Sequence, residues 1–329
     1  MVCALNTVPF VLRNFEKKQN DYSGVAQVAT AVWPEDPTTA SELALDDKHR
    51  KPDRIHGRVV AELNGRIIAF GVYGKLETSP RSREFFFNAL VHPDHQCQGV
   101  GKAIYSYIIG VLSQYKLSVL TTDTRENQTD AVRFLKMRGF EIVQRRPVLR
   151  LNVKSFDSAR ISSGKVHDKR QKITVSTLSE LMLDVPDWKH RCWDLDWEIV
   201  QDIPSPDAPT RSTFESYALQ FDNSDFTPQS WFIALQGDEW VGMSIIDTNP
   251  STPDVFYTSV TGVRRGFRRR GIAMALKLHG IEHVRALGGQ FIETDNDENS
   301  PMLNLNLTLG FERGPAILEF RKTFSAADP

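Results

Sequence analysis

Apolar and polar residues recur along this chain with two periodicities, one typical of strands and the other of helices. In the N-terminal half, the runs HGRVVAEL and RIIAFGVYG flank Asn64-Gly65. An Asn-Gly pair between two apolar runs favours a β-hairpin, because both residues tolerate a positive φ. The run EFFFNALV at 84–91 predicts the next strand. Aliphatic residues then recur at helical spacing and predict a helix: Val100, Ile104, Ile108 and Leu112.

The remainder of this half predicts a strand at 117–123, a helix at 129–139 that ends at Gly139, and a closing pair of strands in FEIVQRRPVLRLNV. The C-terminal half repeats the same order. SWFIALQ, EWVGMSIID and VFYTSVTGV predict strands, residues 270–287 a helix, QFIETD a strand and residues 300–309 a last helix. Strands and helices interleave, which indicates an α/β (α+β) fold class.

The two halves repeat one another at a nearly constant offset. Gly99 and Gly271 lie 172 positions apart (271 − 99), and the segments LKMRGFE and NLTLGFE follow at an offset of 171. Such self-similarity predicts a duplicated domain. We expect domains at 1–154 and 171–329, joined by a polar, serine-bearing linker at 155–170.

Composition narrows the class of protein. The 329 residues include 40 basic and 41 acidic side chains, a formal net charge of −1, which disfavours nucleic acid or an anionic membrane as a partner. Three scattered cysteines without a CxxC pair favour a reduced, cytoplasmic setting and disfavour zinc. We expect no signal peptide at the N-terminus, and no apolar run is long enough to predict a membrane span.

One short pattern occurs in both copies, as QCQGVG at 96–101 and as RRRGIA at 268–273, each between a predicted strand and a predicted helix. A glycine-bearing turn at a helix N-terminus presents unpaired N–H groups at the positive end of the helix dipole, which suits a phosphate. The three arginines of the second copy suit a pyrophosphate. The pattern is neither GxxxxGK[ST] nor GxGxxG. A tight turn with solvated arginines is the structural alternative.

The order of strand, [QR]xxGx[GA], helix, strand, Asn-rich loop, helix and Gly-Phe resembles the GNAT superfamily of acetyl-CoA-dependent N-acetyltransferases. VHPDHQCQGVGKAIYSYII and VTGVRRGFRRRGIAMALKLHGI look like motif A of that family, and ENQTDAVRFLKMRGFE and NDENSPMLNLNLTLGFE look like motif B. The tandem layout is similar to the mycothiol synthase branch. The resemblance implies two tandem GNAT-like domains, each a central mixed sheet flanked by helices, with a splayed strand pair.

The resemblance also implies acetyl-CoA as co-substrate, without a metal. Its pyrophosphate would be clamped by the repeated loop, and its pantetheine would fill the gap between the splayed strands. In the C-terminal copy the implied coenzyme-binding residues are Thr261, Gly262, Val263, Arg268, Arg269, Arg270, Gly271, Ile272, Ala273 and Asn299, the last also an apt N-cap before Pro301. In the N-terminal copy they are Ala89, Leu90, Val91, Gln96, Cys97, Gln98, Gly99, Val100, Gly101 and Lys102, with Gln128 at the place of Asn299.

Attack by an amine on a thioester needs a base or a water chain that removes a proton. The glutamate that many family members use falls at Phe85 and Tyr257 in this sequence, and Glu84 next to Phe85 faces the other way in a regular strand. Tyr257, Ser259 and Thr261 alternate with apolar residues and give that strand one polar face, which either carries water to the amine or is an ordinary solvated face.

The family tyrosine that protonates the leaving thiolate falls at Leu135 and Asn306. Leu135 cannot donate a proton, and Asn306 can only hydrogen-bond the sulfur. Glu293 is a further candidate base, with a surface glutamate as the alternative. The candidate catalytic residues are therefore Tyr257, Glu293 and Asn306.

The stretch WKHRCWDLDW offers a possible acceptor pocket. Its tryptophans either wall such a pocket or pack a helix on the sheet: Trp188, Trp193 and Trp197. Its acids either hold a cationic acceptor or are solvated: Asp194, Asp196 and Glu198. Cys97 lacks an evident base, which disfavours a nucleophilic role.

These features predict an acyltransferase that moves an acetyl group from acetyl-CoA to a primary amine of a small molecule by direct attack. The C-terminal copy is expected to be catalytic and the N-terminal copy structural or degenerate. Two alternatives stay open, a non-catalytic coenzyme-binding or interaction protein and an acyltransferase for a longer acyl-CoA. The acceptor and the oligomeric state cannot be predicted from these motifs.

Overall fold

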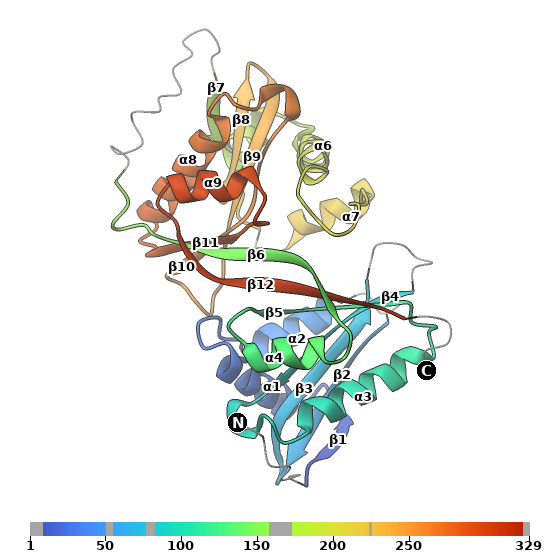
Figure 1. Cartoon of the computed structure of the whole chain (residues 1–329). Coiled ribbons are helices and arrows are strands. Elements are labelled where there is room, and N and C mark those ends of the chain that lie inside the picture. Colours follow the sequence, from blue (N-terminus) through green and yellow to red (C-terminus); the bar gives the residue numbers. More distant parts are fainter. Residues whose placement is uncertain (1–8, 51–54, 77–82, 158–172, 224–225, 325–329) are drawn as a thin grey trace. The chain divides into compact units, whose positions relative to one another are not determined.

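The computed structural model of the chain describes residues 9–50, 55–76, 83–157, 173–223 and 226–324 (Figure 1). Contacts group the chain into two compact units. Unit 1 comprises residues 1–143 and 318–329, and unit 2 comprises residues 144–317.

Unit 1 is built on a mixed sheet with the strand order β1-β2-β3-β4-β5, followed by residues 318–323 of β12. Strands β1 to β4 pair antiparallel with their neighbours, and β4 pairs parallel with β5. The elements in chain order are β1 (Val11–Asn14), α1 (Gln19–Val32), α2 (Ala40–His49), β2 (His56–Leu63), β3 (Arg66–Lys75), β4 (Glu84–Val91), η1 (Pro93–His95), α3 (Val100–Ser113), β5 (Val119–Arg125) and α4 (Thr129–Lys136).

Unit 2 repeats this plan with the order β7-β8-β9-β10-β11, followed by residues 144–152 of β6. β10 pairs parallel with β11, and the other neighbours pair antiparallel. The elements are β6 (Glu141–Asn152), β7 (Ile173–Thr177), α5 (Leu178–Asp184), α6 (Trp188–Val200), α7 (Phe214–Ala218), η4 (Leu219–Asp222), η5 (Pro228–Ser230), β8 (Trp231–Gln236), β9 (Glu239–Thr248), β10 (Val255–Val263), η6 (Arg265–Phe267), α8 (Ile272–Ala286), β11 (Phe291–Asp295), α9 (Pro301–Thr308) and β12 (Glu312–Thr323).

The last strand of each sheet comes from the other copy of the repeat. Residues 148–152 of β6 follow the N-terminal copy in sequence, yet they pair with β11 of unit 2. Residues 318–323 of β12 complete the sheet of unit 1 beside β5, and Phe324 N donates to Ser118 O at 2.8 Å. The predicted closing pair of strands in FEIVQRRPVLRLNV is therefore wrong, because this segment forms one continuous strand.

The predicted domains at 1–154 and 171–329 follow the sequence repeat and stay a prediction. The compact units divide between residues 143 and 144 and between residues 317 and 318. The predicted linker at 155–170 lies mostly outside the described residues.

The parallel strand pair diverges in both units, as predicted. β4 pairs with β5 only from Glu84 to Phe86, and β10 pairs with β11 only from Val255 to Tyr257. Beyond these positions each pair opens toward the repeated loop. In unit 2 the antiparallel register of β9 and β10 also shifts between Thr258 and Val260, which marks a β-bulge at Ser259.

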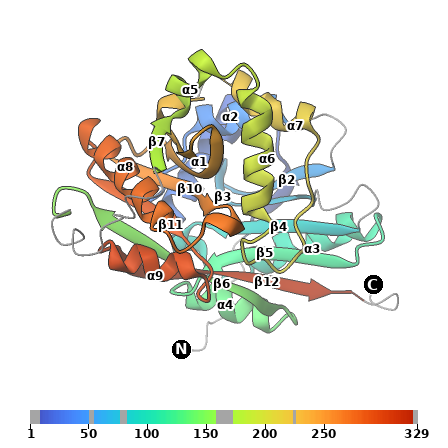
Figure 2. The same cartoon turned by 90° about the horizontal axis from the view of Figure 1, so that it is seen from above.

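The sheet of unit 2 is covered on both faces (Figure 2). Phe232 and Ala234 of β8 belong to the apolar cluster that includes α8 and α9, whereas Ile233 and Leu235 belong to the cluster that includes α6. Successive strand residues point to opposite faces. Helices α8 and α9 therefore cover one face and α6 covers the other.

Several local predictions are confirmed. Asn64 (φ 50°) and Gly65 (φ 77°) form the β2–β3 turn, and Gly139 (φ 78°) follows α4. The four predicted apolar positions of α3 are all buried. The prediction of Asn299 as the N-cap of α9 is wrong. The N-cap is Ser300, whose hydroxyl accepts from Met302 N at 3.2 Å, and Pro301 occupies the first helical position as expected.

Candidate coenzyme site

The repeated loop has the same backbone conformation in both units. In unit 1 it leads from β4 through η1 into α3, with Cys97 at φ 58° and Gly99 at φ 85°. In unit 2 it leads from β10 through η6 into α8, with Arg269 at φ 60° and Gly271 at φ 77°. Two left-handed positions spaced two residues apart therefore define the turn, and glycine takes the second of them without strain.

The first residue of the pattern ties the loop to the end of its strand. Gln96 Nε2 donates to Val91 O at 3.1 Å, and Arg268 Nε donates to Val263 O at 2.9 Å. Glutamine and arginine both carry an N–H group at the required reach. This shared bond explains why either residue can begin the pattern.

The loop presents an anion-binding arrangement of backbone groups. Gly99 and Gly271 are the N-caps of α3 and α8, and their carbonyls accept the hydrogen bonds of Ala103 N and Ala275 N, at 3.0 Å each. The amides that precede Ala103 and Ala275 in the first turns therefore have no intrahelical acceptor. Gly99 has no heavy atom within 4 Å of where a Cβ would stand, so space is open beside the turn. Val100, Gly101, Ile272 and Ala273 contribute the first amides of the two helices.

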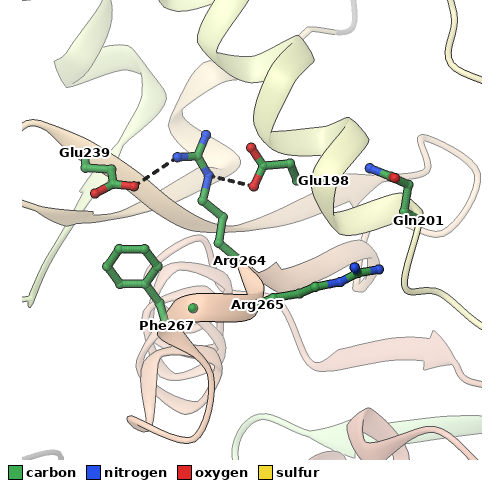
Figure 3. A pocket seen from close by; sticks show the side chains of 7 residues that line it. Glu198, Gln201, Glu239, Arg264, Arg265 and Phe267 are labelled. Carbon is green, nitrogen blue, oxygen red and sulfur yellow. Dashed lines mark hydrogen bonds and ion pairs between the residues drawn. The ribbon is translucent and has the colours of Figure 1, made fainter.

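Carboxylates engage three of the five arginines around the loop of unit 2. Arg264 lies between Glu198 and Glu239, each 3.2 Å away (Figure 3). Arg265 Nε lies 3.0 Å from both oxygens of Asp202, and Arg268 also pairs with Asp202. The hydrogen bonds from Arg265 and Arg268 lower the pKa of Asp202 to about 2. Arg268, expected to clamp a pyrophosphate, is thus already held by a carboxylate and a strand carbonyl.

The other two arginines differ in their surroundings. Arg270 donates to Gly266 O at 2.8 Å and lies over the ring of Phe267, 5.0 Å from its centroid. Arg269 is exposed and has no ion-pair partner among the residues that the structure describes. A cavity of about 360 Å³ adjoins this loop on the α6 side and is lined by Glu198, Gln201, Glu239, Arg264, Arg265, Gly266 and Phe267.

The end of β10 packs tightly on α6. A Cβ at Gly262 would lie 2.2 Å from Ile199 Cγ2, so only glycine fits there. Thr261 Oγ1 lies 2.8 Å from Ser244 Oγ, and Val263 belongs to the α8 cluster. In unit 1 the corresponding Ala89, Leu90 and Val91 pair with β3 in regular register.

The predicted polar face of β10 is interrupted. Before the bulge, Phe256 points toward α8, which places its neighbour Tyr257 on the α6 face. After the bulge, Val260 packs in the α6 cluster, which places Thr261 on the α8 face. Tyr257 and Thr261 therefore lie on opposite faces, because the extra residue at Ser259 reverses the alternation.

Two predicted catalytic residues meet at the point of divergence. Tyr257 of β10 and Glu293 of β11 are register partners in the last paired position of the two strands. Glu293 also lies 3.4 Å from Arg150 Nη1 of β6. This ion pair holds the Glu293 carboxylate beside the position where the two strands diverge.

Asn306 lies on the buried face of α9, and Asn299 lies in the exposed loop before it. Asn306 is fully buried, and its Nδ2 donates to Asn296 Oδ1 at 2.7 Å. Asn306 Oδ1 is buried without a hydrogen-bond partner. The equivalent Leu135 of α4 is buried in the apolar cluster of unit 1, as is Phe85.

The candidate acceptor segment forms α6, and most of its polar and aromatic groups are engaged. Trp188 packs edge-on against Phe221, with ring centroids 4.8 Å apart, and Trp193 Nε1 donates to Ser212 O at 3.0 Å. Asp194 pairs with Arg211, as Glu198 does with Arg264. These contacts favour the packing interpretation of the tryptophans.

The structure sets apart two titratable residues, Asp196, which the sequence had named among the acids of the acceptor segment, and Lys277, which the sequence analysis did not single out. Asp196 of α6 has no ion-pair partner within the described ranges, and burial raises its pKa to about 6. Lys277 of α8 is 3% exposed, and burial lowers its pKa to about 7. A lysine on the apolar stripe of a helix is the signal that could have revealed the second.

Neither a metal-ligand cluster nor a helix that could span a membrane occurs among the residues that the structure describes. No cluster of three or more His, Cys, Asp or Glu side chains suited to a metal ion occurs in the described part of the chain. No helix among the described residues has the length and apolar character that crossing a bilayer requires. The side chains of Cys97 and Lys102 are exposed, and Gln98 Nε2 donates to Asp94 O at 3.1 Å.

Comparison with known proteins gives one family. The model of the acetyltransferase (GNAT) family matches residues 22–140 and 197–311, which together are more than half of the chain. No curated protein matches the sequence significantly.

Solved structures share the whole two-copy architecture. A GCN5-related N-acetyltransferase from Sphaerobacter thermophilus is 18% identical with a TM-score of 0.71, and the match covers 96% of this chain and 97% of that one. A tandem GNAT protein from the clavulanic acid biosynthesis pathway is 16% identical with a TM-score of 0.74, over 97% and 100% of the two chains. A glucosamine N-acetyltransferase region of a fungal multi-domain β-N-acetylglucosaminidase is 14% identical with a TM-score of 0.70, over 95% of this chain and 38% of that chain.

Proposed function

This chain belongs to the GNAT family of acetyltransferases and is an acyltransferase of that type, and we propose that it transfers an acetyl group from acetyl-CoA to the primary amine of a small molecule. The observation that carries this proposal is the loop of unit 2. It places the N-terminus of α8, with Gly271 in the left-handed conformation, directly after a strand that has diverged from its parallel neighbour.

The residues present fit such a coenzyme. The first-turn amides of α8 and the exposed Arg269 suit a pyrophosphate. The facing edges of β10 and β11, which have no backbone pairing beyond Tyr257, suit an extended amide-bearing arm. When bound, acetyl-CoA would supply an acetyl group activated as a thioester. The backbone N–H groups of 261–263 would then stabilise the developing oxyanion.

We propose that the reaction takes place in unit 2. Its loop has basic residues where unit 1 has Gln96 and Gln98, and its α9 presents a buried amide where α4 of unit 1 presents Leu135. The paired Tyr257 and Glu293 at the strand divergence correspond to Phe85 and Thr121 at an offset of 172. Unit 1 would then serve a structural or regulatory role.

An amine acceptor agrees with the chemistry of the α6 face. Tyr257 and Asp196 both belong to elements on this face, and Asp196 is an acid there without an ion-pair partner among the described residues. A carboxylate of this kind attracts an ammonium group and can take up its proton. Glu293 is the second candidate for that role.

Two measurements on the full chain test the proposal. Isothermal titration with acetyl-CoA should give one or two binding sites. Thiol release from acetyl-CoA in the presence of a panel of small primary amines should then show turnover, with the acetylated amine identified by mass spectrometry. Absence of coenzyme binding would contradict the proposal. Binding without turnover, for acetyl-CoA and for longer acyl-CoA, would favour a coenzyme-binding protein.

A further inference from the structure

Lys277 is a buried lysine in the core of unit 2. Lys277 follows Leu276 on α8 and is 3% exposed. Gly280, three residues later on α8, lies against β9, because a Cβ added to Gly280 would be 3.2 Å from Ile246 Cδ1. The Nζ of Lys277 lies 5.6 Å from the ring centroid of Phe311, which follows α9. Lys277 makes no hydrogen bond or ion pair with any residue that the structure describes. A buried amino group without a hydrogen-bond partner is costly, so its presence calls for a partner that binds there.

The repeat shows what normally fills this position. At an offset of 172, Lys277 corresponds to Tyr105 of α3 in unit 1. Tyr105 is enclosed by aromatic rings of β4, α4 and the residues that follow α4, with centroids 5.6 Å from Phe87, 6.0 Å from Phe134 and 6.2 Å from Phe140. The same environment in unit 2 lies among β10, α9 and Phe311. Unit 2 therefore carries a cation where unit 1 carries an aromatic residue.

Two further buried polar atoms belong to the elements around Lys277. Thr258 of β10 is 8% exposed, and its Oγ1 has no hydrogen-bond partner. Asn306 of α9 is fully buried with its Oδ1 unpaired. Thr258 is the register partner of Ile246, which contacts α8 at Gly280, three residues after Lys277. Thr258, Asn306 and Lys277 thus all face the layer between the sheet and the α8–α9 helices, beside the divergence of β10 and β11.

Unpaired buried polar atoms on two elements, beside a buried lysine on a third, indicate that a polar ligand group completes this layer. Asn306 Oδ1 can accept from an amide N–H, and Lys277 can donate to an acceptor or an anion. An amide-bearing arm that ends in sulfur, as in the coenzyme of the proposed function, has both kinds of group. A thiolate beside an ammonium ion is stabilised by the opposite charge.

We propose that Lys277 is the residue that donates a proton to the coenzyme sulfur as the acyl group leaves. This inference rests on the proposed function. The amine nitrogen forms a bond to the thioester carbonyl carbon, and the carbon–sulfur bond breaks with its electron pair on sulfur. The sulfur takes a proton from Lys277, which becomes a neutral amine. The proton that the attacking nitrogen gives up passes to the carboxylate of the proposed function, Asp196 or Glu293, and from there to solvent, and solvent returns one to Lys277.

The electrostatics of the site agree with a proton donor of this kind. Burial alone lowers the pKa of Lys277 to about 7, and no charged group of the described residues acts on it. An acid with a pKa near the working pH releases its proton readily while remaining partly protonated between turnovers. Lys277 would then take the role of the tyrosine that protonates the thiolate in the family, whose position is occupied by Asn306 in this chain.

The test uses the full chain and the variant Lys277→Met, whose unbranched side chain is one heavy atom shorter and carries no charge. Binding of CoA and of desulfo-CoA, which lacks the thiol, is measured by calorimetry at pH 8. We expect the wild type to bind CoA about tenfold more tightly than desulfo-CoA, because the ammonium ion favours the thiolate. The variant should bind the two equally. Its kcat should fall about 100-fold with little change in the KM for acetyl-CoA.

The variant should fold, because methionine suits the apolar cluster and the buried charge is gone. Thermal unfolding checks this, and Lys277→Gln provides a second neutral variant. Lys154→Met, at an exposed lysine of the same unit, is the matched control and should behave as wild type. A Lys277→Met protein that keeps both its preference for CoA and its kcat would overturn the inference. A wild type that binds neither compound would instead overturn the proposed function, and this inference with it.

Discussion

Asp202, just after α6, accepts hydrogen bonds from Arg265 of η6 through both of its carboxylate oxygens, each 3.0 Å from Nε. The same carboxylate pairs with Arg268. A side chain that follows the helix on the α6 face thus holds two guanidinium groups of the loop proposed to bind phosphate. An incoming phosphate would meet these cations already partly neutralised.

We expect Asp202→Asn to tighten the binding of acetyl-CoA. Removal of the carboxylate leaves Arg265 and Arg268 with uncompensated charge near the phosphate site, and a gain of about fivefold in affinity corresponds to one exposed ion pair. The gain should shrink as salt is added. Calorimetric titration at two salt concentrations measures both effects.

Asp194→Asn is the control for this change, because Asp194 pairs with Arg211, on the segment before α7. It should leave the affinity unchanged. A clear loss of affinity in Asp202→Asn would show that Asp202 orients the arginines for the ligand rather than competing with it.

The tie between Arg268 and Val263 predicts a rescue by glutamine. Arg268→Leu removes the bond to the strand carbonyl and should weaken acetyl-CoA binding about fivefold, the loss expected for one hydrogen bond of about 1 kcal/mol. Arg268→Gln should retain most of the affinity, because Gln96 makes the equivalent bond in unit 1 at 3.1 Å. Titration of both variants gives the comparison. If the two lose affinity equally, the charge of Arg268 matters and the tie does not.

Asp196 should make the stability of the chain depend on pH. Its folded pKa, about 6, lies above the ordinary value of 3.8 because burial disfavours the carboxylate. The folded state therefore binds the proton more tightly than the unfolded state, so this group costs nothing below pH 4 and destabilises the fold increasingly as pH rises from 4 to 6. Asp196→Asn should raise the free energy of unfolding by about 3 kcal/mol at most at pH 7.5 and have little effect at pH 4.

Urea unfolding of wild type and variant at the two pH values checks this. Asp194→Asn again serves as the control, since Asp194 is exposed and paired. An equal change at pH 4 and pH 7.5 would show that the effect comes from packing and not from ionisation. Activity of the same variant against an amine substrate reports separately on the proposed role of Asp196.

The repeat made much of the fold predictable from sequence. Glycines at an offset of 172 located the two loops, and Asn64-Gly65 located a hairpin, because each rests on a local backbone requirement that few residues meet. The helix before Gly139 and the apolar stripe of α3 are likewise local. These features depend on neighbours in sequence.

The failures share a different physical origin. The exchange of the last strands depends on pairing between residues more than a hundred positions apart, as for Val148 with Asp295, and no local pattern encodes it. The bulge at Ser259 inserts one residue into a strand whose alternation looks regular, and so it moved Thr261 to the other face. Lys277 was overlooked because the helix around it is apolar, although its counterpart Tyr105 marks the position as enclosed.

The two copies should differ sharply in their response to the same substitution in the loop. Gly271→Glu places a side chain at a residue with φ 77° and puts a negative charge at the N-terminus of α8. Backbone strain of about 1 kcal/mol adds to charge repulsion and lost amide contacts, so coenzyme affinity at this site should fall at least about 100-fold. Turnover should fall with it. Gly99→Glu, at φ 85° in unit 1, imposes the same strain and charge and should leave most of the turnover. Thiol-release assays and circular dichroism on both variants test the pair. Loss of turnover in Gly99→Glu alone, or equal loss in both, would show that the reaction is not confined to unit 2.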